Sequence, residues 1–126
     1  MTPPTIRVVD DDRQILRLFV AILEEGGYRV QSASSGEDAL KVLREVPIDL
    51  MVLDLSMPEP DGFDLLKRLR ASTPGLRIVV VSGYLQGALL KAAEFLGATA
   101  SLNKTDAPRL LLQTVQGILQ KHPRDK

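Results

Sequence analysis

Short apolar segments alternate with longer amphipathic segments along this chain, and that alternation constrains the fold more than any other feature. The short segments lie at residues 6–9, 28–32, 50–53, 78–81 and 99–102. The fourth reads Ile-Val-Val-Val, as expected for a strand that is buried on both faces, whereas the second and fifth are weaker. We therefore predict five β-strands.

The longer segments repeat apolar residues every three or four positions, which predicts α-helices. The helical patterns cover residues 15–23, 34–43, 65–69, 89–96 and 106–118. Gly26 and Gly27 are expected to end the first helix, and Asp106 to cap the last. Strands that alternate with helices predict an α/β fold with a parallel sheet covered on both faces.

Right-handed crossovers leave few topologies for five such units. The common one is the flavodoxin-like, doubly wound (βα)5 arrangement with strand order 2-1-3-4-5. The 126 residues fit a single domain, with a core at about residues 5–121 and short, disordered ends. Sites in open α/β sheets lie outside the carboxyl ends of the strands, so the residues that follow each strand are the candidates.

Composition excludes several classes of site. The chain has no cysteine, which rules out disulfides and thiolate metal sites. Its 16 acidic and 16 basic residues balance, so it has no general attraction to nucleic acid or to anionic membranes. No apolar run approaches the roughly 20 residues of a membrane span, and the first residues lack a signal-peptide pattern. We expect a cytoplasmic protein that binds neither nucleic acid directly nor membrane.

Acidic, hydroxyl and amine side chains follow four of the predicted strands. Asp10-Asp11-Asp12 follows the first strand and Asp54 the third, while Ser82 follows the fourth and Lys104 the fifth. In the predicted order, strands 1, 3, 4 and 5 are neighbours. We therefore expect these side chains to surround one pocket.

These residue types suit phosphoryl transfer. Clustered carboxylates raise one another's pKa, and Mg²⁺ relieves their repulsion because it prefers carboxylate and water oxygens. A carboxylate is ionised at neutral pH, so it attacks phosphorus without a general base. A lysine neutralises the developing charge, and a hydroxyl on the adjacent strand can hydrogen-bond the new phosphoryl oxygen.

Each residue taken alone has a simpler interpretation. One of the three aspartates can cap the first helix, Asp54 and Ser82 can be turn residues, and Lys104 can be an ordinary solvated lysine. The joint pattern favours a site, because independent turn residues need not place this chemistry after four particular strands.

Over nearly its whole length the sequence resembles the receiver domains of two-component response regulators. The resemblance rests on Val8-Val9-Asp10-Asp11, on Leu53-Asp54-Leu55-Ser56-Met57-Pro58 with Asp61-Gly62, on Val81-Ser82-Gly83, on Gly97-Ala98 and on Lys104. It implies that Asp54 accepts a phosphoryl group from a histidine kinase or phosphotransfer protein. It also implies a conformational change that controls a partner, and no catalysis beyond the domain's own phosphotransfer and autodephosphorylation.

The resemblance further implies roles for individual residues. Asp11, Asp54 and the backbone carbonyl of Ser56 are expected to bind Mg²⁺, for which Mn²⁺ is an alternative. Asp10 is expected to assist at the metal through water. Lys104 is expected to contact the phosphoryl group, and Ser82 to move toward it on activation.

Two positions depart from the family pattern. Thr105 follows Lys104 where a proline, often in a cis bond, is usual. A cis bond before threonine is disfavoured by about 2.5–4 kcal/mol, so the family's usual placement of the lysine does not carry over directly to Lys104. Ser101 stands where many members carry an aromatic side chain that swings inward, so that readout is absent.

Three other functions compete with this interpretation. A nucleotide-binding enzyme would need a G-x-G-x-x-G or Walker A motif, and the sequence has neither. An aspartyl-phosphate phosphatase would typically carry a second aspartate where Ser56 stands. A purely structural pseudo-receiver stays open because of Ser101 and Thr105, although the retained acidic residues argue against it.

The sequence does not name the output. No DNA-binding or catalytic segment follows Lys121, so a stand-alone regulator and a piece of a larger regulator or hybrid kinase both fit. In this family the face of helix 4, strand 5 and helix 5 carries the signal, and self-association through it is an option. Part of the last helix is expected to be exposed, because one stripe cannot hide six apolar residues: Leu110, Leu111, Leu112, Val115, Ile118 and Leu119.

Overall fold

Five parallel strands form one sheet in a computed structural model that describes residues 2–35, 38, 47–55, 62–83, 91–94 and 96–121. The strands are β1 (Thr5–Val9), β2 (Arg29–Ala33), β3 (Leu50–Asp54), β4 (Arg77–Ser82) and β5 (Ala100–Asn103). Their order is β2-β1-β3-β4-β5, which confirms the predicted flavodoxin-like topology.

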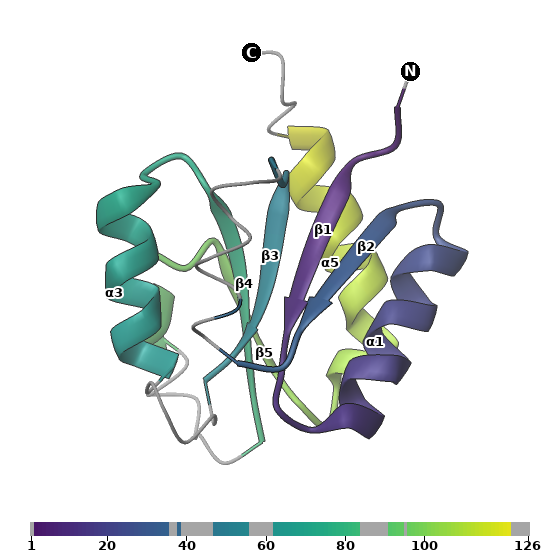
Figure 1. Cartoon of the computed structure of the whole chain (residues 1–126), viewed down its shortest axis with the longest axis horizontal. Helices are drawn as coiled ribbons and strands as arrows, with labels where there is room; N and C mark the ends of the chain where they lie inside the picture. Colours follow the sequence, from purple (N-terminus) through teal and green to yellow (C-terminus); the bar gives the residue numbers. More distant parts are fainter. Residues whose placement is uncertain are drawn as a thin grey trace.

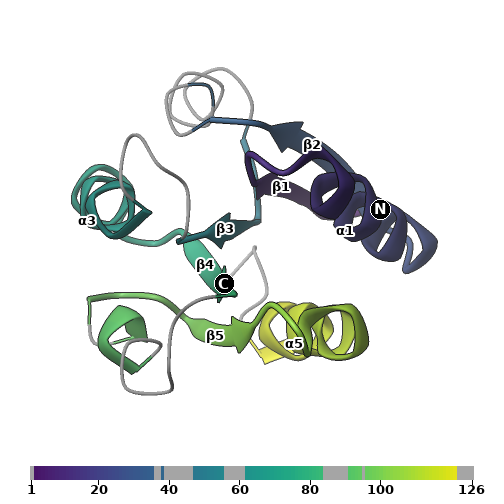
Figure 2. The ribbon, with the colours of Figure 1, turned by 90° about the horizontal axis from the view of Figure 1, so that it is seen from below.

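Helices cover both faces of this sheet. α1 (Arg13–Glu25) and α5 (Ala107–Lys121) lie on one face, and α3 (Gly62–Ser72) lies on the other (Figures 1 and 2). Residues 91–94 are also helical. Most of the helix predicted at 34–43, and part of the one predicted at 89–96, lies outside the described residues.

The two faces explain why β3 has no alternating pattern in its sequence. Leu50 and Val52 join the core beneath α1 and α5, whereas Met51 and Leu53 join the core beneath α3. All four side chains are buried. A strand covered on both faces needs apolar residues at every position, so it appears as a continuous apolar run.

Two strands begin one residue later than the sequence predicted. Tyr28 donates its N–H to the Leu23 carbonyl at the end of α1, which leaves Arg29 to open β2. Thr99 uses its hydroxyl oxygen to accept the N–H of Ile78 at 3.0 Å, so the ladder of β5 starts at Ala100. The first of these bonds is local, whereas the second reaches across to β4, 21 residues away in the sequence.

The predicted exposure of α5 is wrong. Leu111 and Val115 are fully buried, and the other four apolar residues of the set are half-buried against the same core. α1 packs beside α5 and supplies the cover (Figure 2). Leu112 lies so close to Gly26 that a Cβ there would be 2.4 Å from Leu112 Cδ1. Among the described residues, the large exposed hydrophobic side chain is Leu18 of α1.

No helix within the described residues is both long enough and apolar enough to cross a bilayer.

Candidate functional site

The carboxyl ends of β1, β3, β4 and β5 meet at one edge of the sheet, the lower edge in Figure 1. Asp54 is the last residue of β3 and pairs with Val81 of β4. Ser82, the next residue of β4, pairs with Asn103 at the end of β5. The strand register therefore brings the predicted side chains together from distant parts of the sequence.

The three consecutive aspartates divide into one helix cap and two site residues. The Asp12 side chain accepts the N–H groups of Gln14 at 2.9 Å and Ile15 at 3.3 Å, and so caps α1. Asp10 Oδ1 accepts the N–H of Asp12 at 2.9 Å, and this bond fixes the turn between β1 and α1. Asp10 and Asp11 remain for the site.

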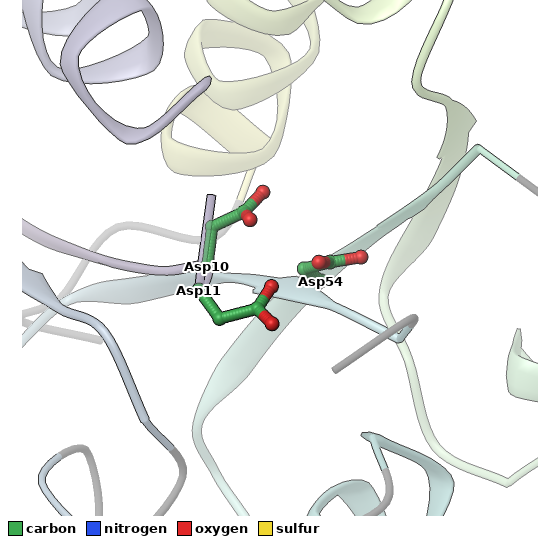
Figure 3. Close-up of side chains that lie close together, drawn as sticks. All are labelled: Asp10, Asp11 and Asp54. Carbon is green, nitrogen blue, oxygen red and sulfur yellow. The ribbon is translucent and has the colours of Figure 1, made fainter. Parts of the chain in front are cut away.

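Asp10, Asp11 and Asp54 form a compact acidic cluster. One carboxylate oxygen of each lies within 4.8 Å of the others, where β1 and β3 end (Figure 3). Asp10 and Asp54 are only 1% and 2% exposed, whereas Asp11 is exposed. The cluster is therefore buried on the side of the sheet and reaches solvent at Asp11.

Lys104 closes the cluster from the side of β5. Its Nζ lies 3.2 Å from Asp10 Oδ2 and 3.3 Å from Asp54 Oδ2. Its backbone N–H donates to the Ser82 carbonyl at 2.9 Å. The side-chain stem passes Gly83, where an added Cβ would lie 3.5 Å from Lys104 Cδ. One ammonium group thus pairs with two buried carboxylates.

Burial and charge shift the protonation of these groups. Burial raises the pKa of Asp10 to about 6, and the charge of Asp54 adds to this, against the Asp12 N–H and the Lys104 charge, which lower it. Burial acts to lower the pKa of Lys104, but the charges of Asp54 and Asp10 outweigh it and leave the pKa raised. Lys104 is therefore positively charged at neutral pH.

The donor set fits a hard divalent cation. Mg²⁺ takes oxygen ligands, and three carboxylates supply them within a small volume. Asp10 Oδ2 is buried and accepts no hydrogen bond within the described part of the chain, although the Lys104 ammonium lies nearby. A bound cation would stabilise the negative charge on such a buried oxygen and would also relieve the repulsion among the three carboxylates. Asp10, Asp11 and Asp54 are the residues that would hold Mg²⁺ or Mn²⁺.

The two serines predicted at the site stand differently. Ser82 is fully buried at the end of β4, one residue beyond the pairing partner of Asp54. Its backbone carbonyl anchors Lys104. Ser56, whose carbonyl is the remaining predicted metal ligand, lies outside the described residues.

Asn103 and Thr105 form a hydrogen-bonded turn around Lys104 that sequence reasoning missed. Asn103 Oδ1 accepts two hydrogen bonds from Thr105, one from its N–H at 2.9 Å and one from its hydroxyl at 2.6 Å. An asparagine that binds the N–H two residues later is a known turn device, so the asparagine after a strand was the available signal.

Ser101 replaces the usual aromatic side chain with a polar link. Its hydroxyl donates to Glu94 Oε2 at 2.5 Å, which ties β5 to the helical residues 91–94. A hydrogen bond therefore connects the strand to this helix where the family usually has an aromatic ring.

A known protein family covers most of this chain. The model of the response regulator receiver domain family matches residues 6–116. The chain belongs to this family. It is therefore a signalling domain of the two-component type, in which phosphorelay is the general mode of action.

Relatives of this chain include a sensor kinase and a transcriptional activator. The chain is 33% identical over 119 residues to the sensor kinase CckA of Brucella abortus (strain 2308), covering 93% of this chain and 13% of that protein. It is 35% identical over 115 residues to the transcriptional activator protein ExaE of Pseudomonas putida, covering 89% of this chain and 54% of that protein. The chain thus spans about half or less of these relatives.

A solved structure of a CheY-like receiver domain protein from Methanospirillum hungatei JF-1 has the same fold. Its TM-score is 0.89 at 28% identity, covering 98% of this chain and 99% of that chain.

Proposed function

We propose that Asp54 of this receiver domain accepts a phosphoryl group from the phosphohistidine of a histidine kinase or phosphotransfer protein, in a Mg²⁺-dependent reaction. The proposal includes one receiver domain over the whole chain, whose conformational change controls a partner or output domain. The observation that carries it is the buried carboxylate of Asp54, held beside Asp10 and Asp11 and 3.3 Å from the Lys104 ammonium.

The chemistry follows from these groups. A carboxylate oxygen of Asp54 attacks phosphorus, the new P–O bond forms as the P–N bond breaks, and the electron pair of that bond returns to the imidazole nitrogen. The Lys104 ammonium, already 3.3 Å from Asp54, pairs with a transferred phosphoryl oxygen. Bound Mg²⁺ would supply further neutralisation of charge on the phosphoryl oxygens.

The remaining assignments complete the proposal. The hydroxyl of Ser82, at the buried end of β4, hydrogen-bonds a phosphoryl oxygen after transfer, and the carbonyl of Ser56 adds a metal ligand. Water then attacks the phosphorus, the bond to the Asp54 oxygen breaks, and inorganic phosphate leaves, which restores the Asp54 carboxylate. Self-association through the face of the predicted helix at 89–96, β5 and α5 stays a prediction. The apolar residues of α5 are buried or half-buried, so their exposure gives it no support.

Labelling with a small phosphodonor tests the acceptor. The protein is incubated with acetyl phosphate and Mg²⁺, and phosphorylation is followed by intact mass. Asp54→Asn should abolish the adduct, because a neutral amide is not a nucleophile. Asp64→Asn is the matched control, since Asp64 is an exposed residue of α3 that pairs with Arg68 at 3.5 Å.

Each outcome discriminates between functions. Labelling of Asp64→Asn but not of Asp54→Asn supports the proposal. Full labelling of Asp54→Asn would assign the acceptor to another residue. A wild-type protein that takes no label from acetyl phosphate or from a phosphorylated histidine kinase would favour the structural pseudo-receiver.

A further inference from the structure

We propose that Asn103 and Thr105 are positioning residues for Lys104, and that their paired hydrogen bonds set how tightly the site holds a phosphoryl group. The inference rests on the proposed function, because it requires Lys104 to contact that group. Asn103 and Thr105 flank Lys104 in the chain, and Asn103 Oδ1 accepts two hydrogen bonds from Thr105.

The direction in which the Lys104 side chain points depends on the conformation of its backbone. Its side chain has a flexible four-carbon stem, and holding it in one conformation costs about 2 kcal/mol of rotamer entropy. The ammonium must nevertheless lie 3.2 Å from Asp10 and 3.3 Å from Asp54. The direction in which the stem leaves the chain therefore decides whether both carboxylates are reached.

Backbone hydrogen bonds alone fix only part of the loop. The Lys104 N–H donates to the Ser82 carbonyl at 2.9 Å, which holds the amino side of the residue. On the other side, the N–H of Asp106 donates to the Asn103 carbonyl at 3.0 Å and closes a turn. Thr105, at the centre of that turn, is exposed, so water competes for its polar groups.

The Asn103 side chain completes the restraint. By accepting both the N–H and the hydroxyl of Thr105, at 2.9 and 2.6 Å, it closes a ring that contains the backbone of Lys104. The N–H bond needs a residue other than proline at position 105, because proline has no N–H. The hydroxyl bond needs serine or threonine there. The two residues thus act as one restraint on Lys104.

The metal ligands are positioned by other contacts. Asp10 is fixed by the pairing of β1 and by the N–H of Asp12, and Asp54 by the pairing of β3 with β4. Loss of the Asn103–Thr105 bonds should therefore weaken phosphoryl binding without weakening Mg²⁺ binding. A general distortion of the site would weaken both.

The test measures these two affinities separately. Mg²⁺ binding, and beryllofluoride binding in saturating Mg²⁺, are followed by calorimetry, because the chain has no tryptophan for fluorescence. Asn103→Ala and Thr105→Val should weaken beryllofluoride affinity by about three- to tenfold, the equivalent of about one ordinary hydrogen bond. Mg²⁺ affinity should not fall, because Lys104 pairs with the carboxylates and is not itself a metal ligand. Thr105→Ser should restore wild-type beryllofluoride affinity.

Two further variants sharpen the result. Thr114→Val removes a hydroxyl that donates to the Leu110 carbonyl at 2.8 Å in α5, and should leave both affinities unchanged. The double variant Asn103→Ala/Thr105→Val should be no weaker than Asn103→Ala, because that change already removes both bonds. Thr105 is exposed, so Thr105→Val and Thr105→Ser should fold normally. If Asn103→Ala does not fold, the comparison of these two variants still tests the inference.

The contrary results are distinct. Wild-type beryllofluoride affinity in both Asn103→Ala and Thr105→Val would overturn the inference, as would a loss of Mg²⁺ affinity in the same proportion. A wild-type protein that does not bind beryllofluoride at all would instead refute the proposed function.

Discussion

The buried carboxylate of Asp10 should make the metal-free domain less stable as pH rises. Its folded pKa of about 6 lies above the ordinary value of 3.8, so the fold disfavours the ionised form. The free energy of unfolding therefore falls as pH increases from about 4 through about 6, and the full loss is present by about pH 7. Asp10→Asn removes the charge and keeps an oxygen that can accept the Asp12 N–H.

The magnitude follows from the two pKa values. The interval between 3.8 and about 6, at about 1.4 kcal/mol for each pH unit, corresponds to about 3 kcal/mol. Because the side chain is only 1% exposed, solvent screening does little to reduce this value. At pH 7.5 the Asn variant should be the more stable protein by up to that amount. Near pH 4, where the acid and the amide are both neutral and similar in shape, the two should be nearly equal.

Urea unfolding in the presence of EDTA, at several pH values between 4 and 7.5, measures this difference. Asp64→Asn on the exposed face of α3 is the control, and should differ from wild type by less than about 0.5 kcal/mol at every pH. A difference between Asp10→Asn and wild type that does not change with pH would refute the reasoning. A variant less stable than wild type at pH 7.5 would mean that attraction to Lys104 outweighs burial.

Two further changes test the metal site and the loop that precedes β5. Asp11→Asn should weaken Mg²⁺ binding by at least about tenfold in calorimetric titration, since it removes a charged ligand, while Asp12→Asn, which keeps a good helix cap, should leave it unchanged. Unchanged Mg²⁺ binding in Asp11→Asn would remove that residue from the site. Gly97→Ala should lower the free energy of unfolding by about 1–3 kcal/mol in urea denaturation, because Gly97 has φ +118° and an added Cβ would lie 2.8 Å from Arg70 Nε. An unchanged denaturation midpoint would show that this loop relaxes around the new side chain.

Much of the fold and of the candidate site could be predicted from the sequence, because the relevant signals are local. The apolar run before Asp54 and the helical spacing after Asp12 report the burial of neighbouring residues, and such burial requires a β-strand or an α-helix. Once strands alternate with helices, chain connectivity limits the sheet order. The residues at the ends of β1, β3, β4 and β5 can therefore be assigned to one edge of the sheet from the sequence alone.

The details that control chemistry came only from the tertiary structure. Any of the three consecutive aspartates has the chemistry of a helix cap, and the turn after β1 decides that Asp12 takes that role. The cover that α1 gives to Leu112 depends on how two helices far apart in sequence pack together.

The distances between the charged groups of the site, and their pKa shifts, also depend on the tertiary structure. Asp54 and Lys104 are 50 residues apart, so the 3.3 Å between their charged atoms depends on the register of three strands. The raised pKa of Asp10 depends on burial by residues that are not its neighbours in sequence. The pattern of apolar residues along the chain identifies which residues stand at the ends of the strands. The packing of the sheet decided which of them touch, because contact and burial are properties of the assembled chain.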